Sequence, residues 1–182
     1  MPIRFAKPAD APAIAAIYAH YVQHTAITFA THTPAAEEYA ARIADDRYPF
    51  LVAETNGTVQ GFVYAAPFRE KEAYRWDVEL TIYLAPGCEG AGIGKKLLTA
   101  CLRLLTAQGY LNAYSCITLP NERSIGLHQR LGFTDLGIFR NTGYKSGSWR
   151  DVIWMGKVLG TFNQPPEEPC RLGALDPAEF SV

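Results

Sequence analysis

The run Glu-Gly-Ala-Gly-Ile-Gly at positions 89–94 constrains the fold most, because it stands between a strand pattern and a helix pattern. Upstream, apolar residues alternate with polar ones, as in a strand with one buried face; they are Trp76, Val78, Leu80, Ile82 and Leu84. Downstream, apolar residues recur at helical spacing as far as Gly109; they are Ile93, Leu97, Leu98, Cys101, Leu102 and Leu105. The pattern predicts a strand, a glycine loop and a helix that begins near Ile93.

Three glycines at a strand-to-helix junction are typical of an anion-binding loop. Glycine lets the backbone approach a ligand closely, and the helix start offers unpaired N–H groups and the positive end of the dipole. The ordinary alternative is a tight turn. A P-loop is excluded because Lys95 and Lys96 are followed by Leu97. A Rossmann site does not fit either, since no acidic residue stands near position 109 to bind a ribose.

The composition favours a small-molecule partner. A chain of 182 residues that is 48% hydrophobic forms one α/β domain more comfortably than two. With 17 basic and 18 acidic residues and no basic block, nothing indicates binding to nucleic acid or to an anionic membrane. The chain shows neither a signal sequence nor a run of 18 apolar residues, so we expect a cytoplasmic protein. Its four cysteines lack metal or redox spacing, and we expect no metal.

Turn and capping residues predict the remaining elements. Asp10 and Thr33 are expected to cap two helices, the second with Pro34 at its first position, and Asn56-Gly57 predicts a hairpin. The predicted strands are 3–6, 50–55, 58–66, 111–117, 133–139 and 152–158, with a short helix over 121–130 and a loop over 141–150. Residues 160–182 are rich in proline and acidic residues, so we expect an appended tail after a domain of residues 1–159.

Two motifs resemble the GNAT superfamily of acetyl-CoA-dependent N-acetyltransferases. Glu89, Gly92 and Gly94 stand at the places of its cofactor-loop pattern Gln/Arg-x-x-Gly-x-Gly/Ala. A later segment also matches, with Asn121, Ser124, His128 and Leu131-Gly132-Phe133. The resemblance implies an α/β GNAT fold: a central mixed, mostly antiparallel, twisted sheet of about seven strands flanked by about four helices.

Further motifs are similar to the phosphinothricin and methionine sulfoximine N-acetyltransferase group. They are Thr28-Phe29, Tyr74-Arg75-Trp76, Glu79, Gly143-Tyr144-Lys145 and Trp149-Arg150-Asp151, and the likeness runs from about Ile3 to Val158. It implies acetyl transfer to a small amino-acid-like amine by direct attack, without a covalent acetyl-enzyme. The group is commonly dimeric, so a homodimer is expected.

The resemblance also implies how acetyl-CoA is bound as a cosubstrate. The backbone of Ile82, Tyr83 and Leu84 would pair with the pantetheine arm, and the side chains of Asn121 and Ser124 would contact CoA. The pyrophosphate would lie on the loop formed by Glu89, Gly90, Ala91, Gly92, Ile93, Gly94 and Lys95. Glu89 and Ala91 depart from the family, which usually has Arg or Gln at the first place and often a basic residue at the second. A carboxylate repels a pyrophosphate unless it turns outward.

Glu79 and His128 are the candidate catalytic residues. Glu79 lies on the strand face opposite Val78 and Leu80, where the resemblance implies a general base; the ordinary alternative is a surface ion pair, for example with Arg75. His128 stands where many GNAT enzymes have a tyrosine that protonates the leaving thiolate. Imidazole titrates near neutrality and could donate this proton, although a single helical histidine is often only packed.

For the acceptor, Arg75 offers a planar fork that suits a carboxylate, and Phe29, Tyr74 and Trp76 could wall a small pocket. Two ordinary alternatives stay open: Phe29 belongs to the core, or Arg75 pairs with Glu79 or Asp77. Two other functions also stay open. One is a GNAT enzyme for a polyamine or a peptide N-terminus, and the other is an acyl-CoA-binding module without turnover.

Overall fold

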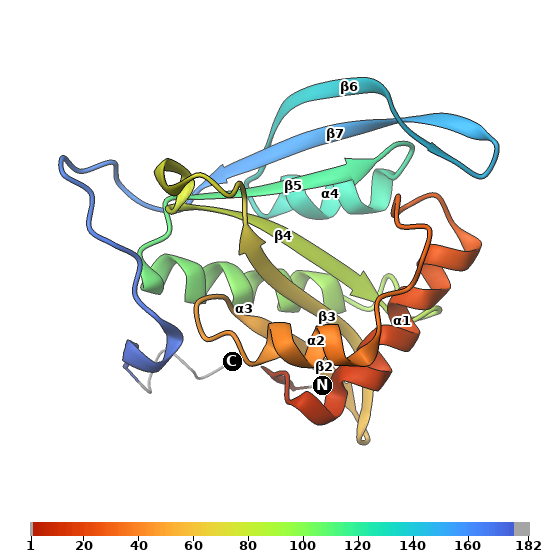
Figure 1. The fold of residues 1–182 in the computed structure, drawn as a ribbon, viewed down its shortest axis with the longest axis horizontal. Coiled ribbons are helices and arrows are strands. Elements are labelled where there is room, and N and C mark those ends of the chain that lie inside the picture. Colours follow the sequence, from red (N-terminus) through yellow and green to blue (C-terminus); the bar gives the residue numbers. More distant parts are fainter. Residues whose placement is uncertain (1, 177–182) are drawn as a thin grey trace.

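In the computed structural model, which describes residues 2–176, seven strands form one sheet in the order β1-β2-β3-β4-β5-β7-β6 (Figure 1). Neighbouring strands are antiparallel except β4 and β5, which run parallel. The strands are β1 Ile3–Phe5, β2 Phe50–Thr55, β3 Thr58–Pro67, β4 Asp77–Leu84, β5 Asn112–Thr118, β6 Thr134–Lys145 and β7 Ser148–Val158. This arrangement confirms the predicted fold class.

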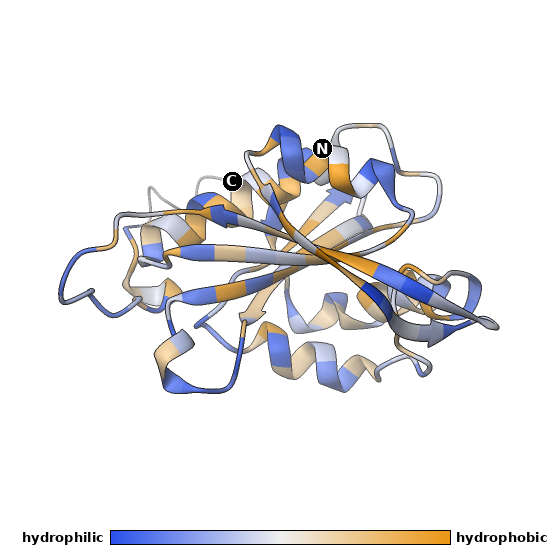
Figure 2. Cartoon of the chain, turned by 90° about the horizontal axis from the view of Figure 1, so that it is seen from above, coloured by the Kyte–Doolittle hydropathy of each residue, from blue (hydrophilic) through white to orange (hydrophobic). Residues whose placement is uncertain are grey.

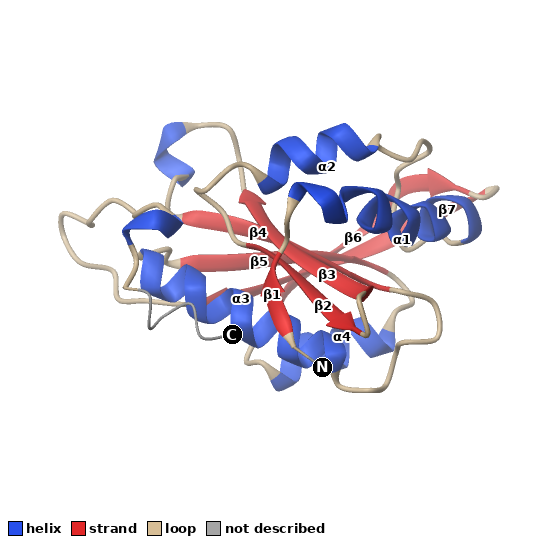
Figure 3. Cartoon of the chain, turned by 90° about the horizontal axis from the view of Figure 1, so that it is seen from below, coloured by secondary structure: helices blue, strands red, loops and turns tan. Residues whose placement is uncertain are grey.

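Four α-helices cover the two faces of the sheet (Figure 3). They are α1 Ala11–His24, α2 Ala36–Ile43, α3 Ile93–Gln108 and α4 Glu122–Arg130. Leu51 and Ala53 of β2 belong to the core cluster that α3 shares, whereas Phe50 and Val52 belong to the cluster under α1 and α2. Because side chains alternate across a strand, one strand supplies both cores. Figure 2 shows hydrophobic residues along the central strands.

The central strand, loop and helix form as the sequence predicts. Val78 and Leu80 of β4 are buried, and Glu79 faces the other side of the sheet. Helix α3 begins at Ile93 and ends before Gly109, whose φ of 91° is the left-handed conformation that favours glycine. The hairpin at Asn56-Gly57 is also confirmed, with positive φ at both residues.

Two predicted helix caps were wrong. Helix α2 begins after Ala35, not at Pro34, and its first turn is closed by the Glu38 carboxylate, which accepts a hydrogen bond from the Ala35 N–H at 2.9 Å. Asp10 precedes α1, but its side chain does not cap that helix. Its carboxylate instead accepts hydrogen bonds from Arg4, at 2.7 and 2.9 Å, and from the Lys7 N–H. Thr33 does not cap α2, because that helix begins after Ala35.

The predicted loop over 141–150 is instead the end of a long hairpin. Strands β6 and β7 pair as far as Lys145 and Ser148, and the chain turns at Ser146-Gly147, where both φ angles are positive. The turn-forming residues that favoured a loop lie within the paired strands. Asn141 takes a positive φ at a bulge, where the register shifts between Phe139 and Gly143, and pairing with β7 resumes after it.

The described part of the C-terminal segment packs against the sheet domain. Leu172 is buried, and its N–H donates to the Asp46 carbonyl at 2.9 Å. The buried Gln108 side chain donates to the Cys170 carbonyl at 2.9 Å and to the Arg47 carbonyl at 3.0 Å. Residues 177–182 of the predicted tail lie outside the described residues, and the domain boundary at 159 stays a prediction.

Candidate active site

A cleft of about 830 Å³ opens where β4 and β5 separate. The two strands pair only from Asp77 to Glu79 on β4 and from Asn112 to Tyr114 on β5. Beyond these residues β4 stays paired with β3 and β5 with β7, so the inner edges diverge (Figure 1). The backbone of Thr81–Leu84 therefore faces the cleft without a neighbouring strand on that side. The Leu84 carbonyl accepts a hydrogen bond from the Tyr21 hydroxyl at 2.8 Å, and the other polar groups on this side are available to an extended ligand.

The glycine loop forms one end of this cleft. Gly90 and Gly92 have φ angles of 82° and 77°, which L-residues adopt at a cost. Gly94 lies in the first turn of α3, where an added Cβ would come within 3.0 Å of Leu127, so glycine lets α3 and α4 approach each other. Helix α3 has no side-chain cap, and its first N–H groups are open to an anion.

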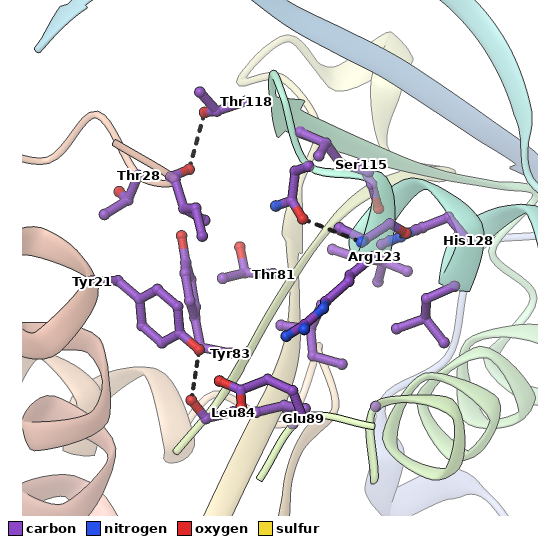
Figure 4. A pocket seen from close by; sticks show the side chains of 18 of the residues that line it. Tyr21, Thr28, Thr81, Tyr83, Leu84, Glu89, Ser115, Thr118, Arg123 and His128 are labelled. Atoms are coloured by element: carbon purple, nitrogen blue, oxygen red, sulfur yellow. Dashed lines mark hydrogen bonds between the residues drawn. The ribbon is translucent and has the colours of Figure 1, made fainter. Parts of the chain in front are cut away.

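Glu89 turns its carboxylate back onto its own loop, where it accepts a hydrogen bond from the Gly87 N–H at 3.0 Å. A carboxylate at this position repels a pyrophosphate unless it turns away, and the hydrogen bond to Gly87 holds the Glu89 carboxylate against the loop. Three basic side chains also line the cleft: Lys95 of α3, and Arg123 and Arg130 of α4. Figure 4 shows Arg123 reaching from α4 toward Glu89. Neither arginine was predicted from the sequence, because two cations separated by two helical turns do not form a basic block.

Asn121 and Ser124 line the cleft at the start of α4. The Asn121 Oδ1 atom caps this helix by accepting from the Ser124 N–H at 3.2 Å. This bond leaves the Asn121 amide nitrogen and the Ser124 hydroxyl available to other partners. The capping role and a ligand contact are thus compatible.

Glu79 lies in the cleft at the point where β4 and β5 separate. Burial raises the pKa of its carboxyl group, while the charge of Arg69 lowers it. Within the described part of the chain, neither a hydrogen bond nor an ion pair engages this carboxylate. The alternative of an ion pair with Arg75 does not match the structure, because the Arg75 guanidinium pairs with Glu72 and Glu168.

His128 is buried in the wall of the cleft, with 1% of its surface exposed, and its ring stands edge-on to Phe133. Its Nδ1 lies 2.8 Å from the Ser124 carbonyl oxygen, which can only accept, so Nδ1 carries the proton and donates. The Nε2 atom is buried without a partner among the described residues. Burial lowers the pKa of the imidazole, which favours the neutral ring with a lone pair on Nε2.

The other end of the cleft is lined by aromatic and hydroxyl side chains. Phe29 and Thr28 come from the loop after α1, and Tyr18, Tyr64 and Tyr83 face them from α1, β3 and β4. The Tyr18 and Thr28 hydroxyl groups lie 2.7 Å apart, and burial raises the pKa of Tyr64 and Tyr83. The sequence predicted Phe29 at the acceptor and Tyr83 only as a backbone contact to the pantetheine arm; it did not predict Tyr18 or Tyr64.

Tyr74, Arg75 and Trp76 lie outside this cleft. The Arg75 guanidinium pairs with Glu168 at 2.8 Å, and the Trp76 indole N–H donates to the Glu167 carbonyl at 2.7 Å. Tyr74 packs edge-on against Phe68. All three precede β4, whereas the cleft opens along the second half of that strand. The structure thus brings Phe29, Glu79 and His128 to one cleft and places Arg75 and Trp76 against the C-terminal segment.

No group of three or more His, Cys, Asp or Glu side chains in residues 2–176 is arranged to hold a metal ion. None of the described helices is long and apolar enough to cross a bilayer.

Comparisons with known proteins agree on one family. The family model for an acetyltransferase (GNAT) domain matches residues 3–154. Phosphinothricin N-acetyltransferase of Streptomyces viridochromogenes is 40% identical over 152 residues, which cover 82% of this chain and 83% of that protein. The L-methionine sulfoximine/L-methionine sulfone acetyltransferase of Salmonella typhimurium is 36% identical over 169 residues, 91% of this chain and 98% of that protein.

A solved structure is similar over nearly the whole chain. The GNAT superfamily phosphinothricin acetyltransferase of Sinorhizobium meliloti, in complex with acetyl-CoA, superimposes with a TM-score of 0.85 at 35% identity, covering 97% of this chain and 95% of the other. With the family model, the relatives and the fold in agreement, the chain belongs to the GNAT family of N-acetyltransferases.

Proposed function

We propose that the protein transfers the acetyl group of acetyl-CoA to the primary amine of a small amino-acid-like substrate of the phosphinothricin or methionine sulfoximine type. The cleft between β4 and β5 carries the proposal, because it joins a glycine loop suited to an anion at one end to a wall of aromatic and hydroxyl side chains at the other. Relatives named for these two substrates, at 40% and 36% identity, support the choice of acceptor.

Acetyl-CoA would bind along this cleft in an extended form. Its pyrophosphate suits the loop 89–94 and the start of α3, with Arg123 and Arg130 offering charge for phosphate groups. Its pantetheine amides suit the edge of Ile82–Leu84, where β4 has no partner strand and only the Leu84 carbonyl is engaged, by the Tyr21 hydroxyl. Asn121 and Ser124 line the same cleft. The thioester would then lie between Glu79 and His128.

Glu79 is proposed as the general base. An α-amino group has a pKa of about 8, so part of it is protonated at neutral pH and must lose a proton before it attacks. The ionised Glu79 carboxylate has no competing partner in the described chain and can accept this proton, directly or through a water. The amine nitrogen then forms a bond to the thioester carbonyl carbon, the C–S bond breaks, and the thiolate of CoA leaves.

The role of His128 is revised in this proposal. A general acid would need the imidazolium form, which burial opposes. The neutral ring, whose Nδ1–H is engaged by Ser124, keeps a lone pair on the buried Nε2 atom, which can accept a hydrogen bond from a group that reaches it when the wall of the cleft adjusts to a ligand. We therefore assign His128 to accept hydrogen bonds in the cleft.

The test is release of CoA thiol from acetyl-CoA with each of several amines: phosphinothricin, methionine sulfoximine, ordinary amino acids, spermidine and a short peptide. We expect turnover of the first two and its loss in Glu79→Gln, with acetyl-CoA binding retained. Preference for spermidine or the peptide would refute the acceptor class. Tight acetyl-CoA binding without any turnover would instead favour a binding module.

We also propose a homodimer formed through the β6–β7 hairpin. Strand β6 is an edge of the sheet, so its outer backbone groups can pair with the same strand of a second copy. Large exposed apolar side chains gather on this hairpin; they are Leu136, Ile138, Phe139, Tyr144, Trp149 and Val158. In light scattering after size exclusion, Phe139→Asp should give a monomer, and Phe162→Asp, an exposed control outside the hairpin, should not. A dimeric Phe139→Asp protein would contradict this interface.

A further inference from the structure

The loop between α1 and α2 forms one wall of the cleft at its acceptor end. Residues 25–35 contain neither helix nor strand, and Ile27, Thr28 and Phe29 line the cleft. Within the loop, the Ile27 and Ala30 N–H groups donate to the hydroxyl groups of Thr25 and Thr28, both at 3.2 Å. These bonds engage N–H groups, so contacts from outside the loop must hold its carbonyl groups.

Two side chains from neighbouring parts of the sheet hold consecutive carbonyl groups of this loop. The Lys145 Nζ atom donates to the Thr28 carbonyl at 2.7 Å, and the Thr118 hydroxyl donates to the Ile27 carbonyl at 2.9 Å. Figure 4 shows the Thr118 bond next to Thr28. Lys145 stands near the tip of the β6–β7 hairpin and Thr118 at the end of β5. With both carbonyls held, the two consecutive peptide groups Ile27–Thr28 and Thr28–Phe29 have defined orientations.

Burial makes the Lys145 contact unusual. Only 8% of this residue is exposed, whereas lysine is seldom buried unless it is paired or hydrogen-bonded. The same strand also accommodates Phe29. A Cβ added to Gly143 would overlap the Phe29 ring, so the ring lies directly on the β6 backbone. From the other side, the Tyr18 hydroxyl contacts the Thr28 hydroxyl at 2.7 Å.

We propose that Lys145 is a positioning residue, which together with Thr118 and Gly143 holds residues 27–29 as a wall of the amine-substrate pocket. This inference rests on the proposed function of the cleft. Small displacements of a substrate-positioning wall reduce the rate strongly, because the reacting atoms must lie close together and aligned. The glycine loop and α4, which face the CoA end, have no part in these contacts.

The test compares Lys145→Met, which keeps the aliphatic length and removes the ammonium group, with Lys145→Arg and Thr118→Val. Lys71→Met, at an exposed residue that does not line the cleft, is the matched control. Loss of a hydrogen bond from a charged donor predicts a rise in the amine KM of about tenfold or more for Lys145→Met. We expect a smaller rise for Thr118→Val, partial rescue by Lys145→Arg, and an unchanged Kd for acetyl-CoA in all variants.

A direct contact between Lys145 and a substrate carboxylate would give a different result. One proton of the ammonium group is donated to Thr28, and the other two could bind a substrate carboxylate. The assay therefore compares an amino acid with its amide, which lacks the carboxylate. Positioning predicts that the KM for both acceptors rises in Lys145→Met. A rise confined to the carboxylate-bearing acceptor, or an unchanged KM in a folded variant, would overturn the proposal.

Hydrogen–deuterium exchange separates this inference from the proposed function. In Lys145→Met and Thr118→Val, backbone amides of residues 25–35 should exchange faster than in the wild type, while those of α3 should not change. This result is expected even if another amine proves to be the substrate. Unchanged exchange over residues 25–35 in both variants would refute the positioning role.

Discussion

Replacing Gly92 by alanine tests whether the glycine loop binds acetyl-CoA, and Gly57 provides a matched control. Both glycines have a φ of 77°, and a Cβ added to either would meet nothing within 4 Å. They differ in their surroundings, because Gly92 immediately precedes α3 and lines the cleft, whereas Gly57 lies in the hairpin turn between β2 and β3. The two substitutions therefore share the backbone strain and differ in their effect on the ligand.

The shared strain is about 1–2 kcal/mol, the cost of left-handed backbone for an L-residue. For a chain of this length, 1 kcal/mol corresponds to roughly 2–4 °C in Tm, so both variants should melt several degrees below the wild type. At Gly92 the added methyl also stands beside the N–H groups that would hold a phosphate. Loss of one such charge-assisted hydrogen bond costs about 1.5–3 kcal/mol, which raises Kd roughly ten- to hundredfold.

Calorimetry measures both quantities on the same samples. Scanning calorimetry should give similar losses of Tm for Gly92→Ala and Gly57→Ala, and titration calorimetry should show weaker acetyl-CoA binding for Gly92→Ala alone. Equal acetyl-CoA affinity in the two variants would refute the assignment of this loop to the pyrophosphate.

Three further predictions concern Glu79, His128 and Leu172. Burial raises the folded-state pKa of Glu79, so the folded protein holds this proton more tightly than the unfolded chain does. The free energy of unfolding should therefore fall as pH rises above the ordinary carboxyl range. In urea unfolding, Glu79→Gln should not show this fall. Burial lowers the folded-state pKa of His128, so stability should fall as pH drops through about 6.5, the ordinary value. His128→Gln should lose less Tm than the wild type between neutral and mildly acidic buffer, and an equal loss would argue against a buried neutral ring. Leu172→Ala should lower the free energy of unfolding by about 2–3 kcal/mol in a denaturant titration, because Leu172 is buried, and should leave kcat unchanged, because Leu172 does not line the cleft. Wild-type stability would show that this segment contributes little to the domain.

Local patterns were sufficient to predict the centre of the fold. The alternation before the glycines, the helical spacing after them and the Asn56-Gly57 turn each depend on residues that are neighbours in sequence. These elements formed within one or two residues of the expected bounds. The orientation of Glu79 followed from the same alternation, because successive strand residues point to opposite faces.

Long-range contacts decided what the sequence could not predict. Arg75 had several possible acidic partners, and its partner Glu168 lies 93 positions away in a segment that was expected to be a tail. Asn141 and Gly143 are typical of loops, yet pairing with β7 holds them in a bulged strand. Arg123 became a cleft residue only because α4 folds across the open edge of β4 and β5, which is a tertiary arrangement.

The most direct test of the account is a competition in one reaction. Purified protein receives acetyl-CoA with equal concentrations of phosphinothricin, methionine sulfoximine, spermidine and a short peptide, and mass spectrometry identifies the acetylated products. The account predicts N-acetyl derivatives of phosphinothricin or methionine sulfoximine as the main products, and their loss in Glu79→Gln. Acetylation of spermidine or the peptide in preference to both would contradict it.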